Sequence, residues 1–279
     1  MIGLQTALLP AADWRGGLDR FEALAREFDL GACELHLATD HYAAACPAGD
    51  EVGDEIATRL RPAVARLGVH LPFARLAGGI PEPLVAGLAF AARVGADAAI
   101  LHLRGEPHPV AGWTALVAPL AVRARALGVP LCLENADDAR EIALVRAVAA
   151  AVDARVCLDV GHLHERLYPA RGLRRKLLVA NDRFSPRPFA CPARLPAGAR
   201  GWARALDEVG ERLAWVHLHD HDGRRAHRPL GAGRIDWAPL AGRHEALLSV
   251  PVILETDHRD RDPESVRADL RRLKELLAG

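Results

Sequence analysis

The sequence predicts a (β/α)8 barrel, on three observations. Eight short runs of Val, Ile, Leu, Ala and Cys alternate with eight longer segments from one end of the chain to the other. In the longer segments the apolar residues recur at three- and four-residue spacing, which is the helical pattern. The chain has 279 residues, close to the roughly 250 that such a barrel needs. We therefore expect residues 1–279 to form a single barrel domain.

The expected strands and helices follow from this alternation. The strands are expected at Ile2–Leu8, Ala32–Leu37, Val69–Phe73, Ala98–Leu103, Pro130–Glu134, Arg155–Asp159, Ala214–His219 and Val250–Glu255. The helices are expected at Gly17–Phe28, Gly53–Leu67, Pro83–Val94, Trp113–Leu127, Asp138–Val152, Trp202–Arg212, Trp237–Leu247 and Pro263–Leu277. Half of all residues are hydrophobic but only 5% are aromatic, so the core must consist mainly of aliphatic side chains.

Glycines separate several helices from the strands that follow them. Gly68, Gly95 and Gly128 each stand between a helical pattern and a strand pattern, where a left-handed residue can end a helix. Strands that alternate with helices form a parallel sheet, and right-handed crossovers allow that sheet to close. An open doubly wound sheet is the alternative. No GxGxxG phosphate turn follows the first strand, which disfavours it.

One segment interrupts the alternation between the sixth strand and its helix. Residues 163–200 are rich in Pro and Arg and far exceed the usual length of such a loop. In a barrel the loops after the strands surround the active face, so this insertion is expected over the mouth. It is either a lid over the substrate, or a disordered insertion or contact between subunits.

Composition excludes several classes of function. Acidic and basic residues balance at 36 each, which argues against a general nucleic-acid-binding surface. The only lysines, Lys176 and Lys274, lie outside the expected strands, which argues against Schiff-base chemistry. The five cysteines form no CxxC pair, and no signal peptide or membrane span is expected. We expect a cytoplasmic protein without disulfides that acts on a small molecule and can form a homo-oligomer.

Polar side chains close most of the expected strands. An acid or imidazole that ends an apolar strand lies at the C-terminal rim of a barrel, at the shared mouth. The residues in such positions are His70, His102, Glu134, Asp159, His162, His217, His219 and Glu255. Any one of them can be a hydrogen-bonded rim residue. Several carboxylates in one mouth repel each other, and a divalent cation relieves the repulsion and explains the imidazoles. Such mixed ligands suit Mn, Zn, Co, Fe or Mg.

The motifs LCLEN, LDVGH, VHLHD, PLGAGRIDW and the terminal ILE, in this order, resemble the xylose isomerase-like or AP-endonuclease-2 TIM barrels. The resemblance covers most of the chain. It implies that Glu134, Asp159, His217 and Glu255 hold a divalent metal, with His219 the weaker candidate for the histidine ligand. It also implies that His162 contacts the substrate or a further metal.

The epimerases of this superfamily imply one function. Epimerisation moves a proton beside a carbonyl and needs a base on each face of the substrate. Carried over, Glu134 and Glu255 are this catalytic pair, assisted by His162. Arg104, Arg225 and His219 are candidate substrate-binding residues. The chain is then a metal-dependent isomerase or epimerase of a small sugar or polyhydroxy carbonyl compound.

The endonucleases of the superfamily imply an alternative, a metal-dependent phosphoesterase acting on a small phosphodiester. There, His70 and His102 with Glu134 resemble the ligands of a second metal, and His227 resembles a ligand of a third. Arg225 stands where the family pattern has a carboxylate, which speaks against a complete third site. A third interpretation, a non-catalytic sugar-binding barrel, is disfavoured because every ligand of the main metal site is present.

Overall fold

A computed structural model describes most of the chain. The described residues are 1–5, 14–37, 50–106, 108–136, 139, 141–165, 201–222, 225–238, 247, 249–256 and 263–278. The expected insertion falls mainly on residues 166–200, which lie outside this set, as does most of the helix expected at Trp237–Leu247. Among the described helices, none is long and apolar enough to cross a membrane.

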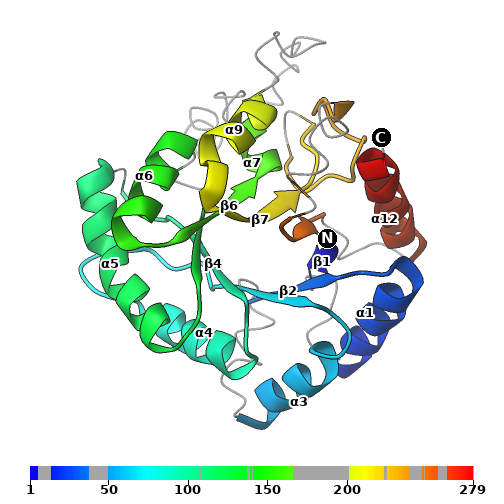
Figure 1. The fold of residues 1–279 in the computed structure, drawn as a ribbon, viewed down its shortest axis with the longest axis horizontal. Coiled ribbons are helices and arrows are strands. Elements are labelled where there is room, and N and C mark those ends of the chain that lie inside the picture. The colour runs from blue at the N-terminus through cyan, green and yellow to red at the C-terminus, as the bar shows by residue number, and fades with distance from the viewer. Residues whose placement is uncertain are drawn as a thin grey trace, which may run out of the picture.

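Eight parallel strands close into a barrel in sequence order, which confirms the predicted fold class (Figure 1). The strands are β1 (Ile2–Gln5), β2 (Ala32–His36), β3 (Arg66–His70), β4 (Ala98–His102), β5 (Leu131–Glu134), β6 (Arg155–Asp159), β7 (Leu213–Leu218) and β8 (Val252–Leu254). Pairing of β1 with β8 closes the ring, with Leu4 beside Leu254.

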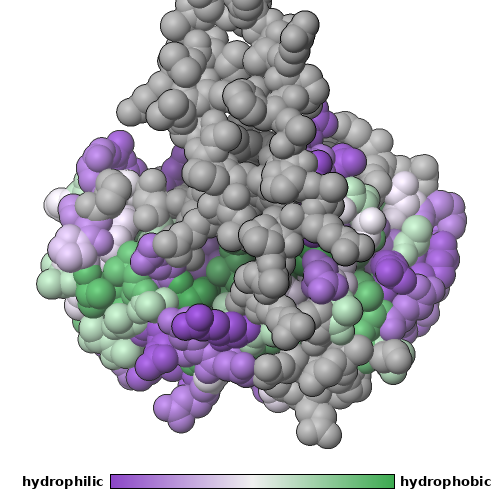
Figure 2. Space-filling view, turned by 90° about the horizontal axis from the view of Figure 1, so that it is seen from above, coloured by the Kyte–Doolittle hydropathy of each residue, from purple (hydrophilic) through white to green (hydrophobic). Residues whose placement is uncertain are grey.

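Helices surround the strands in an outer ring. They are α1 (Trp14–Phe28), α3 (Asp50–Leu60), α4 (Glu82–Arg93), α5 (Val110–Ala126), α6 (Ile142–Val152), α7 (Val160–Glu165), α9 (Gly201–Val209), the short 3-10 helix η4 (Gly210–Arg212) and α12 (Pro263–Ala278). Hydrophilic and hydrophobic residues are interspersed over the described part of the face in Figure 2. The only large hydrophobic side chains exposed among the described residues are Phe73, Val110 and Val122.

The third strand differs from its prediction. Helix α3 ends at Leu60 instead of Leu67, because Pro62 follows and cannot donate the backbone hydrogen bond that would continue the helix. The strand therefore begins at Arg66 and ends at His70, and Phe73 lies beyond it. Gly68 accordingly lies inside β3 and does not end a helix. Gly95 and Gly128 have φ of +64° and +72°, as expected for glycines that end helices.

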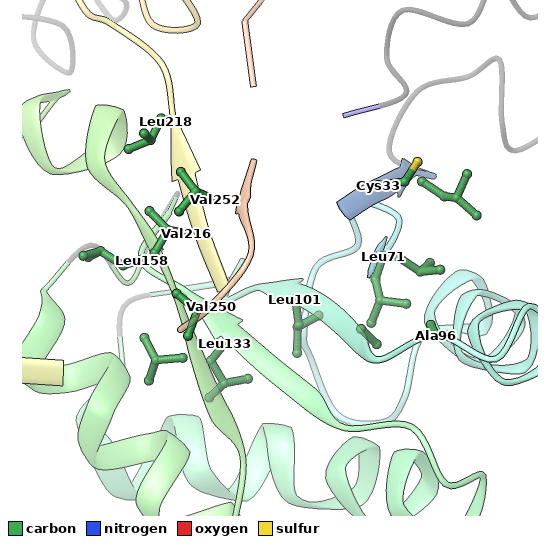
Figure 3. Packing of buried hydrophobic residues seen from close by; sticks show 14 of the residues in the cluster. Cys33, Leu71, Ala96, Leu101, Leu133, Leu158, Val216, Leu218, Val250 and Val252 are labelled. Carbon is green, nitrogen blue, oxygen red and sulfur yellow. The ribbon is translucent and has the colours of Figure 1, made fainter. Parts of the chain in front are cut away.

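Alternation along each strand divides the core into two parts. Outward-facing side chains such as Leu101, Leu133 and Leu158 pack against the helices (Figure 3). Inward-facing residues fill the barrel with a second cluster. Its members are Ala32, Ala98, Ile100, Cys132, Cys157, Trp215 and Ile253. Cys33, Cys132 and Cys157 are buried free thiols, which pack in the core as small apolar residues.

Trp215 fills the barrel only because Gly68 stands opposite. A methyl group added at Gly68 would lie 2.6 Å from Cζ2 of Trp215. We therefore expect Gly68→Ala to lower the free energy of unfolding by about 1–3 kcal/mol, the usual cost of overpacking a core. Urea denaturation measures the change. Gly79→Ala is the control, because no atom lies within 4 Å of the added methyl group. Equal stability of the two variants would contradict the packing described.

Candidate metal centre

The inward alternation of each strand continues into a polar layer at the mouth. Two residues beyond Cys132 on β5 comes Glu134, and two beyond Cys157 on β6 comes Asp159. On β7, His217 follows Trp215 in the same way, and Glu255 follows Ile253 of β8. Local strand geometry thus places the charged group directly above the apolar core. The polar residues buried in this layer are Gln5, Glu34, His36, His70, His102, Glu134, Asp159, His217, His219 and Glu255.

Four of the predicted residues form one cluster. Potential ligand atoms of Glu134, Asp159, His217 and Glu255 all lie within 4.8 Å of one another. Nδ1 of His217 lies at the centre, 3.0 Å from Oε2 of Glu255, 3.5 Å from Oε2 of Glu134 and 3.9 Å from Oδ2 of Asp159. The structure therefore brings together the side chains predicted to share one metal. We refer to these four residues as the main cluster.

The polar atoms of the main cluster are suited to a cation. Both carboxylate oxygens of Glu134, Oε2 of Glu255 and Nδ1 of His217 are buried and have no hydrogen-bond partner. The close approaches of histidine nitrogens to Glu134 lack hydrogen-bond geometry. Burying such groups without partners is costly, whereas a divalent cation between them would satisfy all four atoms. The residues present therefore fit a divalent metal.

A second cluster shares Glu134 with the first. Nε2 of His70 and Nε2 of His102 lie 3.1 Å apart, and Oε2 of Glu134 lies 3.2 and 3.1 Å from them. Ligand atoms around one zinc ion lie roughly 3.4 Å apart in tetrahedral geometry, so this triangle has about the size of a coordination sphere. Nδ1 of His70 lies 3.1 Å from the carbonyl oxygen of Leu71. When Nδ1 donates a hydrogen bond to that oxygen, the lone pair lies on Nε2 of His70, which is then the ligand atom.

The third candidate group contains His162, His219 and His227. Both nitrogens of His219 are engaged, since Nδ1 accepts the backbone N–H of His227 at 2.9 Å and Nε2 lies 3.1 Å from Oδ1 of Asp159. This arrangement makes His219 a hydrogen-bond donor to Asp159. His227 presents Nδ1 to the carbonyl oxygen of Glu255 at 3.0 Å, which leaves its Nε2 as the atom available to a ligand.

Charges in the main cluster hold one another in their ionised forms. Burial alone would raise the pKa of Glu134, but the neighbouring His102 and His217 hold it well below its usual range. Burial likewise opposes the low pKa of Glu255, which results from His217. Burial would lower the pKa of His217, but Cys157 and the carboxylates of Glu34, Glu255 and Glu134 together raise it well above normal. A cation bound at Nδ1 would thus take the place of a proton, so metal binding should release protons.

The pKa of His227 gives a prediction for stability. Burial, with His219 as the next cause, lowers this pKa to about 4. Since an unfolded histidine titrates near 6.5, only the unfolded state binds this proton between about pH 6.5 and 4. The folded state therefore loses on the order of 2–3 kcal/mol as pH falls through that window. Urea denaturation of metal-free protein should show a smaller loss for His227→Gln than for the original protein. Equal losses would contradict the assignment.

Asp220 organises the loop that carries His227. Its buried carboxylate accepts hydrogen bonds from the backbone N–H groups of His221, Gly231 and Ile235 and from Nε1 of Trp237. These donors explain the PLGAGRIDW motif as a loop wrapped around one carboxylate. Backbone hydrogen bonds in both directions between Asp220 and Arg228 close the segment that contains His227. His227 itself has a φ of 55°. This backbone conformation is uncommon for residues other than glycine and recurs at functional sites.

Three further members of the polar layer were not predicted from the sequence. They are Gln5, Glu34 and His36, each inward-facing on β1 or β2 and at most 7% exposed. The signal was present in the strand ACELH, where alternation places Glu34 and His36 on the same face as Ala32. His36 packs edge-on against His70, with ring centroids 4.5 Å apart. His36, His70 and Glu255 also place potential ligand atoms within 4.8 Å of one another.

Comparison with known proteins identifies the family. The family model described as xylose isomerase-like TIM barrel matches residues 23–276. The chain belongs to this family. No curated protein matches the chain in a sequence search.

Solved structures share the fold of this xylose isomerase-like barrel over nearly its whole length. A D-tagatose 3-epimerase-like protein has a TM-score of 0.67 at 15% identity, covering 99% of this chain and 97% of its own. The TTHB071 protein from Thermus thermophilus, in a crystal soaked with ZnCl2, has a TM-score of 0.61 at 25% identity, covering 98% and 97%. The 3-keto-D-glucoside 4-epimerase YcjR from E. coli has a TM-score of 0.61 at 14% identity, covering 100% and 99%.

The two arginines predicted to bind substrate lie outside the clusters of this xylose isomerase-like barrel. Arg104 is exposed, with its guanidinium carbon 5.8 Å from the ring centroid of Phe73. Phe73 in turn packs 4.7 Å from the ring of His102, so Arg104 lies at the rim beside the second cluster. Arg225 is exposed, and within the described residues no ion pair joins it to the main cluster. Their roles in substrate binding remain predictions.

Proposed function

We propose that the protein is a divalent-metal-dependent isomerase or epimerase of a small sugar or another small polyhydroxy carbonyl compound. The observation that carries the proposal is the convergence of Glu134 and Glu255 at the mouth. They come from β5 and from the end of β8, and the ring of His217 approaches both carboxylates. Three of their four carboxylate oxygens are buried without a hydrogen-bond donor. Sugar epimerases with the same fold support this class of reaction.

The proposed metal ligands are Glu134, Asp159, Nδ1 of His217 and Glu255. Their mixture of nitrogen and oxygen suits Mn, Zn, Co, Fe or Mg. When bound, the cation would polarise the substrate carbonyl and make the neighbouring C–H group more acidic. Because the similar protein TTHB071 was crystallised and soaked with ZnCl2, zinc is the first metal to test for binding to this protein.

In the proposed reaction the two glutamates act on opposite faces of one carbon atom. One carboxylate takes the proton from carbon, and the electron pair of the broken C–H bond moves toward the carbonyl oxygen. The other carboxylate, after taking up a proton from water, delivers it to the opposite face as the electron pair returns from oxygen to carbon, and exchange with water restores both glutamates. His162 lies beside them, with Nε2 3.9 Å from Oε1 of Glu134. It is placed to donate a hydrogen bond to a substrate oxygen.

Replacing Glu255 by glutamine tests this proposal. The amide cannot accept a proton from carbon, so the epimer whose C–H bond faces Glu255 should no longer take up solvent deuterium, and turnover should fall by roughly 10²–10⁴-fold. Mass spectrometry of small ketoses incubated with the metal-loaded protein in D2O measures the exchange. Asp97→Asn is the control, because Asp97 binds Arg61 and Arg66 away from the mouth. Unimpaired deuterium uptake by that epimer in Glu255→Gln would exclude this proton-transfer role.

The second cluster favours one other candidate function, a metal-dependent phosphoesterase for small phosphodiesters. A cation held by His70, His102 and Glu134 would share a carboxylate with the main cluster, and two close cations assist displacement at phosphorus. This function requires two metals per chain and hydrolysis of bis(p-nitrophenyl) phosphate. His102→Ala should then abolish hydrolysis. A protein that holds a single metal and leaves phosphodiesters intact would exclude it.

A further inference from the structure

A carboxylate that belongs to neither proposed cluster contacts the central histidine. Oε2 of Glu34 lies 2.8 Å from Nε2 of His217, and both residues are fully buried. The other ring nitrogen of His217, Nδ1, faces the carboxylates of the main cluster. Glu34 accepts a hydrogen bond but cannot donate one in its ionised form, so Nε2 must carry the proton. In a neutral ring the lone pair then lies on Nδ1.

Gln5 connects Glu34 to the main cluster. Its amide nitrogen donates to Oε1 of Glu34 at 3.0 Å and to Oε1 of Glu255 at 2.8 Å. Both partners are carboxylates, so the group between them must be the NH2 end of the amide, because an oxygen there would be repelled by both. This bond occupies one oxygen of Glu255 and leaves Oε2, which faces Nδ1 of His217.

The barrel itself builds this arrangement. Gln5 and Glu34 are direct partners in the pairing of β1 with β2, and Leu4 pairs with Leu254 where β1 meets β8. Glu34, Gln5 and Glu255 are therefore consecutive cross-strand neighbours around the mouth. Gln5 is 5% exposed and Glu34 is fully buried, so water competes little for their hydrogen bonds.

We propose that Glu34 and Gln5 are positioning residues that select the ligand atoms of the metal centre. Glu34 fixes the tautomer of His217, so that Nδ1 faces the metal. Gln5 holds Oε1 of Glu255 by a hydrogen bond, so that Oε2 of Glu255 also faces the metal. A histidine ligand whose second nitrogen donates to a carboxylate is more basic and held in one orientation. This inference rests on the proposed metal site but not on which reaction the site performs.

Zinc binding measured without any substrate tests the proposal. We expect Glu34→Gln and Gln5→Leu each to weaken Zn²⁺ binding by about 10–100-fold, measured by competition with a chromogenic chelator. The double variant should lose less than the product of the two single losses, because the residues act through one network. Asp97→Asn changes a carboxylate to an amide in the same way as Glu34→Gln but lies outside the network, and should bind Zn²⁺ normally.

A second readout follows the ring of His217 directly. In zinc-loaded protein labelled with ¹⁵N-histidine, NMR should show a proton on Nε2 of His217 and zinc on Nδ1. In Glu34→Gln the Nε2 proton should exchange faster with water, because its charged acceptor has gone. A purely structural role for Glu34 would change stability without changing this signal.

The zinc affinities of the variants and of the original protein decide whether Glu34 and Gln5 position the ligands. Unchanged zinc affinity and an unchanged His217 signal in folded Glu34→Gln would overturn the proposal. If that variant does not fold, Gln5→Leu decides, and affinity within about threefold of the original protein would overturn it. If the original protein binds no Zn²⁺, the proposed metal site fails and this inference fails with it. If the original protein binds Zn²⁺ and neither Glu34→Gln nor Gln5→Leu weakens binding, the positioning role is refuted while the proposed metal site stands.

Discussion

Replacing Glu134 by glutamine should abolish metal binding in both clusters and remove catalysis. Oε2 of Glu134 lies 3.1 Å from Nε2 of His102 and 3.5 Å from Nδ1 of His217, so this carboxylate belongs to both the main and the second cluster. The amide keeps the shape but loses the charge, and also loses the ability to transfer a proton. We expect turnover to fall by roughly 10²–10⁴-fold and the zinc content of the purified protein to fall sharply.

Metal analysis and the deuterium-exchange assay measure the two effects of this change. Glu211→Gln is the matched control, because Glu211 is exposed at η4, next to the N-terminal end of β7 and away from the mouth. Retention of full metal content by Glu134→Gln would show that Glu134 is a rim residue and not a ligand.

The largest loss of stability is expected from Asp220→Ala. The change leaves four N–H donors of the loop without their buried acceptor. Removing one partner of such a buried charged network costs about 3–5 kcal/mol. We expect the melting temperature to fall on the order of 10 °C, measured by thermal denaturation followed by circular dichroism.

Asp236→Ala provides the control in the same loop. Asp236 is exposed, and its side chain accepts a hydrogen bond from the backbone N–H of Ala238. Its replacement should cost less than about 1 kcal/mol. If both variants melt at the same temperature, the carboxylate of Asp220 does not hold the loop together.

Periodicity was sufficient to predict the fold. The helical spacing of the long segments and the aliphatic strands indicated eight β/α units, and the structure closes all eight strands into one barrel. The error at β3 arose because Val69–Phe73 is as apolar as the true strand. Pro62 decides the register, since it ends α3 early and allows the strand to begin at Arg66.

The main cluster was predictable because its residues end apolar strands, where a charge is conspicuous. Glu134 after LCL and Asp159 after VCL are examples, and the structure brings both to the same point. Glu34 was missed because it lies inside its strand, two residues before the strand end at His36, where a charge has no obvious role. Only its distance to His217 reveals one. That contact joins residues 183 positions apart in the sequence, which no local pattern encodes.

We propose that a divalent metal binds between β5, β6, β7 and β8. A crystal of the protein grown with Zn²⁺ and measured at the zinc absorption edge would show whether it does. We expect an anomalous peak within about 2.0–2.2 Å of Glu134, Asp159, Nδ1 of His217 and Glu255. A second peak among His70, His102 and Glu134 would add the second metal. An empty main cluster in protein saturated with zinc would show that these four residues do not form a metal site.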